Sequence, residues 1–194
     1  SNPETYDFSV FMRDVQNFLR FDWLGGTASA ATRTWDGGGG GDTNWNTATN
    51  WSADTVPIAG DAVVFDGTST NNSTMNVAVP ALLSFDVSSG YTGTITVTVD
   101  QSTDAAFGAT PFAAAFTFQM NTTTAAETAA FTMSNGTVSA NAGTRVFNVS
   151  GNVSITGGTW NGGTIQLVQG PQTLSSTITF GDADGEGCSI WARD

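Results

Sequence analysis

The sequence predicts a mainly β protein, a short β-solenoid preceded by an N-terminal amphipathic helical arm, and three observations lead to this prediction. Charged residues make up only 11% of the 194 residues, and the small polar residues that replace them suit strands and tight turns. The spacing of apolar residues changes from helical to strand-like near residue 26. From residue 112 onward, short apolar runs recur along the chain, as in stacked solenoid coils.

The predicted organisation has four regions. An arm over residues 1–25 precedes a Trp- and Gly-rich β region over 26–110, a quasi-repetitive solenoid region over 111–181 and an acidic C-terminal tail over 182–194. The first boundary follows the change in apolar spacing, and the second marks the start of the repeats.

The arm carries the start and stop signals of a helix. Asn2 can cap the first turn, Pro3 fits the first helical position, and Gly25 ends the pattern. Six large apolar residues between them are spaced three and four apart and share one helical face: Phe8, Phe11, Met12, Val15, Phe18 and Leu19. Such a face must be covered, either by the β body of the same chain or by a neighbouring subunit, for which it would be an assembly arm. Apolar residues also alternate over 6–12, which allows a donated strand.

Strand-like runs separated by Gly, Asn, Ser and Pro follow the arm, at 61–65, 75–79, 82–87 and 94–99. Farther on, the centres of five apolar runs recur at a short and nearly constant interval: Phe116, Phe131, Phe147, Ile165 and Phe180. A repeat this short predicts a solenoid in which each coil covers the next. A β-sandwich or jelly roll is the alternative, because short strands with frequent turns also build that fold.

The charge balance argues against several partners. Seventeen acidic residues stand against five scattered arginines, which gives a net charge of −12. Nucleic acids and anionic membranes are bound by clustered basic residues, so we expect neither as a direct partner. No run approaches the ~18 apolar residues of a membrane span.

The missing residue types argue against catalysis. Without His the chain has no imidazole base, and without Lys it has no Schiff-base or phosphate-loop lysine. Cys188 is the single cysteine, so no disulfide can form within the chain. We therefore predict a protein that is not an enzyme and that needs no cofactor.

Residues 32–52, TRTWDGGGGGDTNWNTATNWS, combine five consecutive glycines with three tryptophans. A phosphate-binding loop needs a following helix and basic residues, which this acidic stretch lacks. The tryptophans Trp35, Trp45 and Trp51 have two interpretations. Exposed, they would make contact with a glycan; folded inward, they would plug one end of a β stack, with each indole N–H on a backbone carbonyl.

A second candidate site is the sequence GDADGEG at 181–187. Asp182, Asp184 and Glu186 stand at alternate positions before Gly187, as in a calcium loop. The position that should hold a bidentate Glu is Arg193, so the motif is incomplete. A solvated acidic turn is the alternative to a calcium site.

The stretch from 32 to 77, followed by GYTGTITV at 90–97, resembles a module of bacterial cell-surface and phage structural proteins. In that module a Trp- and Gly-rich opening precedes an NW…VP…D.V.F step and β-helical repeats. Residues 157–180 are similar to the solenoid coils of autotransporter-like surface proteins. The resemblance covers residues 32–99 and, more loosely, 131–180. It implies a passive, exterior, β-rich structural role, and it carries over no catalytic residues.

These observations predict a non-enzymatic structural subunit of an exterior assembly. The first hypothesis is a phage virion decoration or fibre protein on the virion exterior, docking through its arm on copies of itself or on a major capsid protein. The alternative is a subunit of a secreted bacterial surface filament or adhesin, and a carbohydrate-binding module is a further alternative. The opening SNPETYD lacks a leader pattern, which fits either a trimmed initiator Met or an already cleaved signal peptide.

Overall fold

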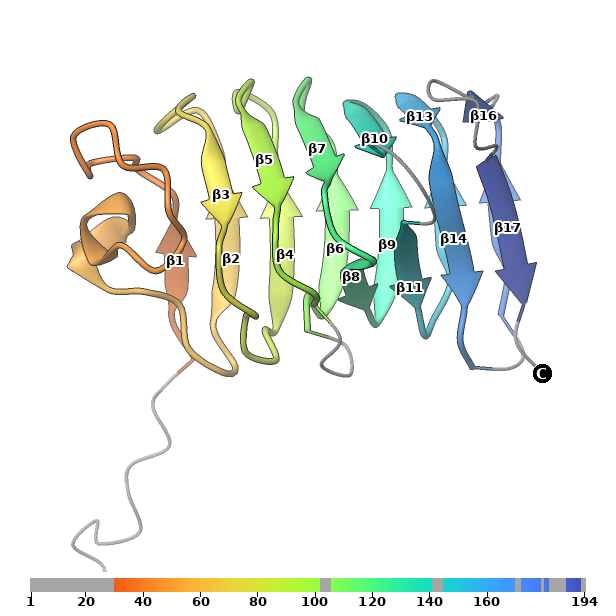
Figure 1. Cartoon of the computed structure of the whole chain (residues 1–194), viewed down its shortest axis with the longest axis horizontal. Helices are drawn as coiled ribbons and strands as arrows, with labels where there is room; N and C mark the ends of the chain where they lie inside the picture. The colour runs from red at the N-terminus through yellow and green to blue at the C-terminus, as the bar shows by residue number, and fades with distance from the viewer. Residues whose placement is uncertain are drawn as a thin grey trace, which may run out of the picture.

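The chain forms a parallel β-solenoid of about five turns, as predicted from its repetitive β pattern. In this computed structural model the described residues are 30–101, 106–140, 145–169, 172–178, 180–181 and 188–192. Figure 1 shows the strands stacked along the long axis, with β1 at one end and β17 at the other. The predicted arm over residues 1–25 lies outside the described residues.

Three parallel sheets form the sides of the solenoid. The long sheet has the order β1 (Thr32–Thr34), β2 (Ala62–Phe65), β4 (Ser84–Val87), β6 (Ala109–Phe112), β9 (Ala130–Met133), β12 (Val153–Ile155) and β15 (Leu174–Ser176). The second, here called the threonine sheet, has the order β3 (Ser73–Met75), β5 (Thr94–Val97), β7 (Thr117–Met120), β10 (Thr137–Ala140), β13 (Thr159–Asn161) and β16 (Phe180–Gly181). The short sheet has the order β8 (Thr124–Thr128), β11 (Val146–Val149), β14 (Gly163–Leu167) and β17 (Cys188–Ala192).

The short sheet starts only at β8, so the first coils have no strand on that side. There a buried glutamine joins neighbouring segments. The Gln101 side chain is fully buried, accepts a hydrogen bond from the Val79 N–H at 2.9 Å and donates to the carbonyls of Val77 and Val99. The backbone N–H of Gln101 donates to Thr124 at the start of β8. Gln101 therefore replaces ladder hydrogen bonds that strands would otherwise make.

Strict alternation of side chains explains why these sequences form coils. In β2, β4, β5, β7, β10 and β11, every second residue is buried and the others are partly exposed. Paired strands are in register, so an inward residue lies beside the inward residue of the next coil, as Val63 does beside Phe85 and Phe65 beside Val87. The period of two thus becomes continuous apolar columns.

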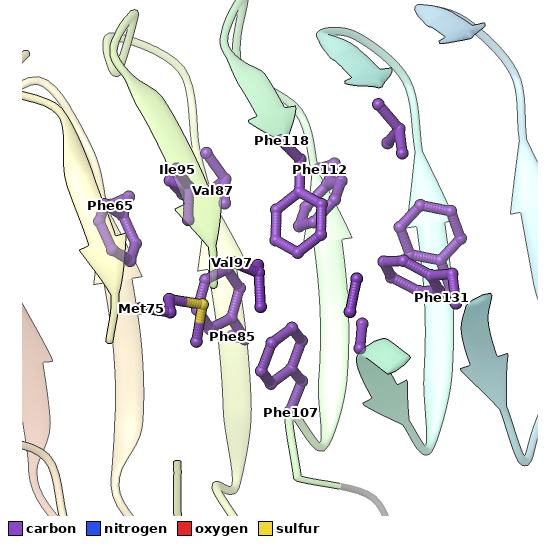
Figure 2. Packing of buried hydrophobic residues seen from close by; sticks show 14 of the residues in the cluster. Phe65, Met75, Phe85, Val87, Ile95, Val97, Phe107, Phe112, Phe118 and Phe131 are labelled. Carbon is purple, nitrogen blue, oxygen red and sulfur yellow. The ribbon is translucent and has the colours of Figure 1, made fainter. Parts of the chain in front are cut away.

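Aromatic rings fill the interior from end to end. Consecutive ring pairs make contact along the axis with centroid separations from 4.6 to 6.3 Å: Trp45–Phe85, Phe85–Phe107, Phe107–Phe118, Phe118–Phe147, Phe147–Trp160 and Trp160–Phe180. Figure 2 shows Phe65, Phe85, Phe112 and Phe131 following one another between the strands. One buried hydrophobic cluster includes these residues apart from Phe180, which packs against it, and the cluster continues across the boundary predicted near residue 110.

Two details of the sequence prediction were wrong. The run 75–79 was expected to be a strand, but β3 covers Ser73–Met75 and ends where the run begins. The repeat is also longer than the interval between apolar runs, because Phe131 pairs with Val153 in the next coil and Val153 pairs with Leu174 in the one after. One coil contains up to three strands and their turns, so the shorter interval links runs that belong to different sheets.

We expect the aromatic column to dominate stability. Phe147 is fully buried and its ring lies 4.7 Å from Phe131 and 5.7 Å from Trp160. Phe147→Ala should lower the free energy of unfolding by about 3–5 kcal/mol, because the cavity cannot collapse between stacked coils. Urea titration followed by circular dichroism measures this loss. Thr132→Ala, on an exposed position of β9, is the control and should stay within about 0.5 kcal/mol of the wild type.

Candidate functional site

The tryptophan-rich stretch lies at the N-terminal end of the solenoid, where it closes the first coil. Trp35, Trp45 and Trp51 are each 0% exposed. Trp51 contacts both other indoles edge-on, with ring centroids 4.4 Å from Trp45 and 5.1 Å from Trp35. Trp45 stacks on Phe85 of β4, and Trp35 stacks on Phe65 of β2. The three rings therefore begin the aromatic column and present no open face to a glycan.

Two of the three indole N–H groups of this cluster bond to backbone carbonyls. Trp51 Nε1 donates to the Trp45 carbonyl at 2.7 Å, and Trp35 Nε1 donates to the Asn71 carbonyl at 3.1 Å. Asn71 lies in the segment before β3, so the second bond ties the opening of the chain to the next coil. Buried indoles need such partners, because an unpaired N–H away from water costs free energy.

The glycine run allows the loop to pass close to a buried asparagine. The Asn50 side chain is fully buried, accepts a hydrogen bond from the Gly39 N–H at 2.8 Å and donates to the carbonyls of Asp42 and Asn44. A Cβ on Gly39 would lie 2.5 Å from Asn50 Oδ1, and one on Gly38 would lie 2.6 Å from the Thr49 carbonyl oxygen. Glycine is required here for close backbone approach, a structural use of a sequence that superficially resembles a phosphate loop.

A buried ion pair fixes the start of the first coil. Asp61 is 1% exposed and accepts hydrogen bonds from the backbone N–H groups of Ala31 and Ile58 and from Arg33 Nε at 3.2 Å. Burial by itself raises the pKa of this carboxyl, but the two N–H donors and the Arg33 guanidinium outweigh it and lower the pKa below the usual range. Asp61 therefore stays ionised and joins the entry of the chain to the segment before β2.

Another carboxyl has its pKa moved in the opposite direction. Burial on the outer face of the long sheet raises the pKa of Asp86, and the nearby Asp66 carboxylate raises it further. The in-register neighbour of Asp86 in β2 is Val64, which leaves Asp66 as the charged group that acts on it. Asp86 lies on the outer surface of a sheet of alternating small and apolar residues.

A ladder of hydroxyl groups follows the outer face of the threonine sheet. Thr94, Thr117, Thr137 and Thr159 pair in register through four successive strands. Beside them an open hollow of about 380 Å³ is lined by the turns that precede β7, β10 and β13. Gly136 and Gly158 adopt positive φ of 83° and 90° in these turns, where a Cβ would contact the preceding coil. The described lining offers hydroxyl and amide groups for hydrogen bonds and no group for acid–base catalysis.

The C-terminal end of the solenoid carries exposed apolar side chains. Ile190 is 38% exposed and Trp191 is 65% exposed, both on β17. Leu174 of β15 and Phe180 of β16 are only partly buried. These four residues, here called the open end, form the last layer of coil among the described residues.

Two predicted sites cannot be placed. The six apolar arm residues lie outside the described residues, as do the calcium candidates Asp182, Asp184 and Glu186 together with Arg193. Within the described part of the chain, no three His, Cys, Asp or Glu side chains come together as a metal would require. The helices described there are single 3₁₀ turns, η1 (Ala48–Asn50) and η2 (Ser52–Asp54), and none is long or apolar enough to cross a membrane.

The polar groups that organise the first coils were not found from the sequence. The side chains of Asn50, Asp61 and Gln101 form their hydrogen bonds with segments that lie earlier in the chain, so directly adjacent residues give little sign of their roles. One local signal exists: Asp61 stands directly before the apolar run of β2, where an acidic side chain can accept from nearby backbone N–H groups.

Comparison with known proteins gives no match: no protein-family model, no curated protein sequence and no solved structure is similar to this chain. The resemblance of residues 32–99 to a surface-protein module therefore stays a prediction.

We expect Trp51 to act as the cap of the first coils. Trp51→Ala should destabilise this end by about 3–5 kcal/mol, since it removes the ring that joins the other two indoles. Hydrogen exchange should then accelerate for amides of β1 and β2, because coils depend mainly on their neighbours. Trp191→Ala is the matched control at an exposed tryptophan, and equal acceleration of β1 and β2 in both variants would contradict the assignment.

The Asp61 ion pair should make stability depend on pH. A carboxyl whose folded pKa is lowered stabilises the fold above its ordinary pKa of about 3.9, and this contribution is lost as the pH falls through the folded value. Asp61→Ala should cost about 3 kcal/mol at pH 7, because two backbone N–H groups and Arg33 lose their acceptor. Urea titrations between pH 7 and pH 3 should show this difference shrinking below about pH 4. Asp61→Asn, which keeps an acceptor but cannot ionise, should differ from Asp61→Ala by a constant amount.

Proposed function

We propose that this chain is a non-enzymatic structural subunit of an exterior assembly, docking through its N-terminal arm. The observation that carries the proposal is the unbroken column of aromatic contacts from Trp45 to Phe180. A solenoid filled in this way is a solid rod, and rods of stacked coils are suited to spacing, bearing load and resisting proteolysis. Such a body presents its outer faces and its ends to partners.

The character of the outer surface supports the same role. The outward positions of the threonine sheet carry Thr, Ser, Gln and Asn, which are small or uncharged groups along a flat face. The net charge of −12 keeps separate rods apart in solution, so assembly needs a specific apolar contact. The apolar arm predicted over residues 1–25 would supply that contact.

We place the assembly first on a virion exterior, as a decoration or fibre protein bound to its own copies or to a major capsid protein. The alternative setting is a secreted bacterial surface filament or adhesin, and both follow from the resemblance of residues 32–99. A capsid or portal gene beside the coding gene would favour the virion, and a signal peptide encoded upstream would favour secretion. Carbohydrate binding through Trp35, Trp45 and Trp51 has no support from their buried rings.

Comparing the full chain with a version that lacks residues 1–25 tests the proposal. Light scattering should show large oligomers for the full chain and a monomer for the truncated one, since burying six large apolar side chains is worth about 10 kcal/mol before ordering costs. Circular dichroism should show the same β signal for both. Monomers in both cases would overturn self-assembly, and loss of the β signal on truncation would show that the arm belongs to the core of its own chain.

A further inference from the structure

The hollow beside the threonine sheet extends along the axis of the solenoid, across four coils. Its lining residues come from the segments at the start of β5, β7, β10 and β13, which are successive neighbours in that sheet. Figure 1 shows these strands following one another along the long axis. Three strand spacings of ~4.8 Å make the hollow about 14 Å long. It is an elongated trough, here called the threonine trough, with polar side chains from Thr92, Thr117, Asn135, Thr137 and Thr159.

The threonine trough holds hydrogen-bonding groups that the described part of the protein leaves unused. The hydroxyl groups of Thr92, Thr117, Thr137 and Thr159 make no hydrogen bond to another described residue. All four residues are exposed or partly exposed. Each hydroxyl can donate one hydrogen bond and accept two, so this capacity is open to a ligand.

The amide of Asn135 is held in place at the side of the trough. Its Oδ1 accepts a hydrogen bond from the Gly136 N–H at 2.8 Å. The NH₂ group has no partner among the described residues and can donate to a ligand. The turn itself is tightly packed, because a Cβ on Gly136 would lie 2.8 Å from the Phe116 ring. The polar groups of the trough are therefore positioned before a ligand arrives, which lowers the ordering cost of binding.

The composition of the trough selects an uncharged, polar ligand. Its described lining contains no acidic or basic side chain that would hold an ion. The net charge of −12 also repels anions such as nucleic acids. The aromatic residue of the lining, Phe116, is only 3% exposed, so the trough offers little apolar surface to a lipid or an apolar peptide. Hydroxyl and amide groups complement the hydroxyl groups of sugars, which both donate and accept hydrogen bonds.

The spacing of the hydroxyl groups fits a chain of sugar rings. Thr117, Thr137 and Thr159 are register partners, so they recur at the strand spacing of ~4.8 Å. A linear polysaccharide advances by nearly this distance for each ring. An extended peptide advances by ~3.3 Å for each residue, so it would lose step with the threonines after one or two residues.

We propose that the threonine trough binds a linear, uncharged polysaccharide that lies along the axis of the solenoid, with one ring to each coil. Four coils would hold about four rings. The threonine hydroxyls would exchange hydrogen bonds with ring hydroxyls, and the Asn135 NH₂ group would donate to a sugar oxygen. The site lies on the side of the body, so it is separate from the buried tryptophans and does not depend on assembly through the arm.

Affinity electrophoresis of the full chain tests this site. Each native gel contains one polysaccharide. The uncharged probes are amylose, glucomannan, galactomannan, xyloglucan and arabinoxylan, and the charged probes are polygalacturonate and heparin. At least one uncharged polysaccharide should retard the protein, and the charged ones should not. Retardation by none of the uncharged probes, or by the charged ones alone, would overturn the proposal.

Fragments of the retarding polysaccharide measure the length of the site. Fragments of about four rings should compete as well as longer ones, because they fill the trough. Fragments of two rings should compete at least about tenfold more weakly, since they reach half of the hydrogen-bonding groups. Equal competition by the single sugar and by the longer fragments would contradict a site that crosses four coils.

Substitutions locate the binding on the trough. Thr117→Val combined with Thr137→Val keeps the branched shape, removes two hydroxyl groups and should weaken binding at least about tenfold. Thr96→Val combined with Thr132→Val is the matched control, because both residues lie at outward positions outside the trough. The control should bind as the wild type does.

Circular dichroism shows whether each variant keeps the β signal. Where the variant of Thr117 and Thr137 loses it, Asn135→Ala decides, since this exposed side chain adds a donor at the side of the trough. Its affinity should fall about fivefold. Wild-type affinity in a trough variant that keeps the β signal would overturn the assignment.

Discussion

The structure depends on one constraint, the in-register stacking of parallel coils, in which every inward apolar side chain lies on its counterpart in the coil before. The backbone ladder holds successive strands about 4.8 Å apart, and that spacing suits the packing of flat rings as well as of aliphatic side chains. The run of aromatic contacts from Trp45 to Phe180 lies in the interior that the stacked coils enclose; Trp160 and Phe180 in it are register partners, and the other pairs join residues of different sheets and turns. A shift by one residue in any strand would turn its apolar side chains to the solvent, so the register and the core specify each other.

The same constraint explains why polar groups inside the body are few and tightly bound. Gln101 supplies hydrogen bonds on the side that lacks strands in the first coils, and Asn50 holds the glycine run against the first turn. Asp61 joins the entering chain to β2 through two N–H donors and Arg33. Each of these residues stands where the regular ladder is interrupted, because an interruption leaves backbone groups that need other partners.

The stacked coils present three different sheets on their sides, and the chemistry of these faces bears on the proposed function. The threonine sheet repeats small uncharged residues, including the ladder from Thr94 to Thr159, whereas the outer face of the long sheet carries the acidic Asp86. One end is closed by three buried indoles, while the other leaves Ile190 and Trp191 exposed.

The sequence by itself determined the β class, favoured a solenoid over a sandwich and located several strands, among them β2, β4, β5, β7 and β11, because alternation and turn residues are local signals that survive in any context. It left two interpretations of Trp35, Trp45 and Trp51 open: exposed rings or rings buried in the β stack. The burial of all three rings depended on packing against Phe65 and Phe85, which belong to later coils. The length of one coil and the roles of Asn50, Asp61 and Gln101 were decided by tertiary structure alone. These features depend on which strands become neighbours around the axis, and pairing between segments a whole coil apart leaves no mark on the spacing of adjacent residues.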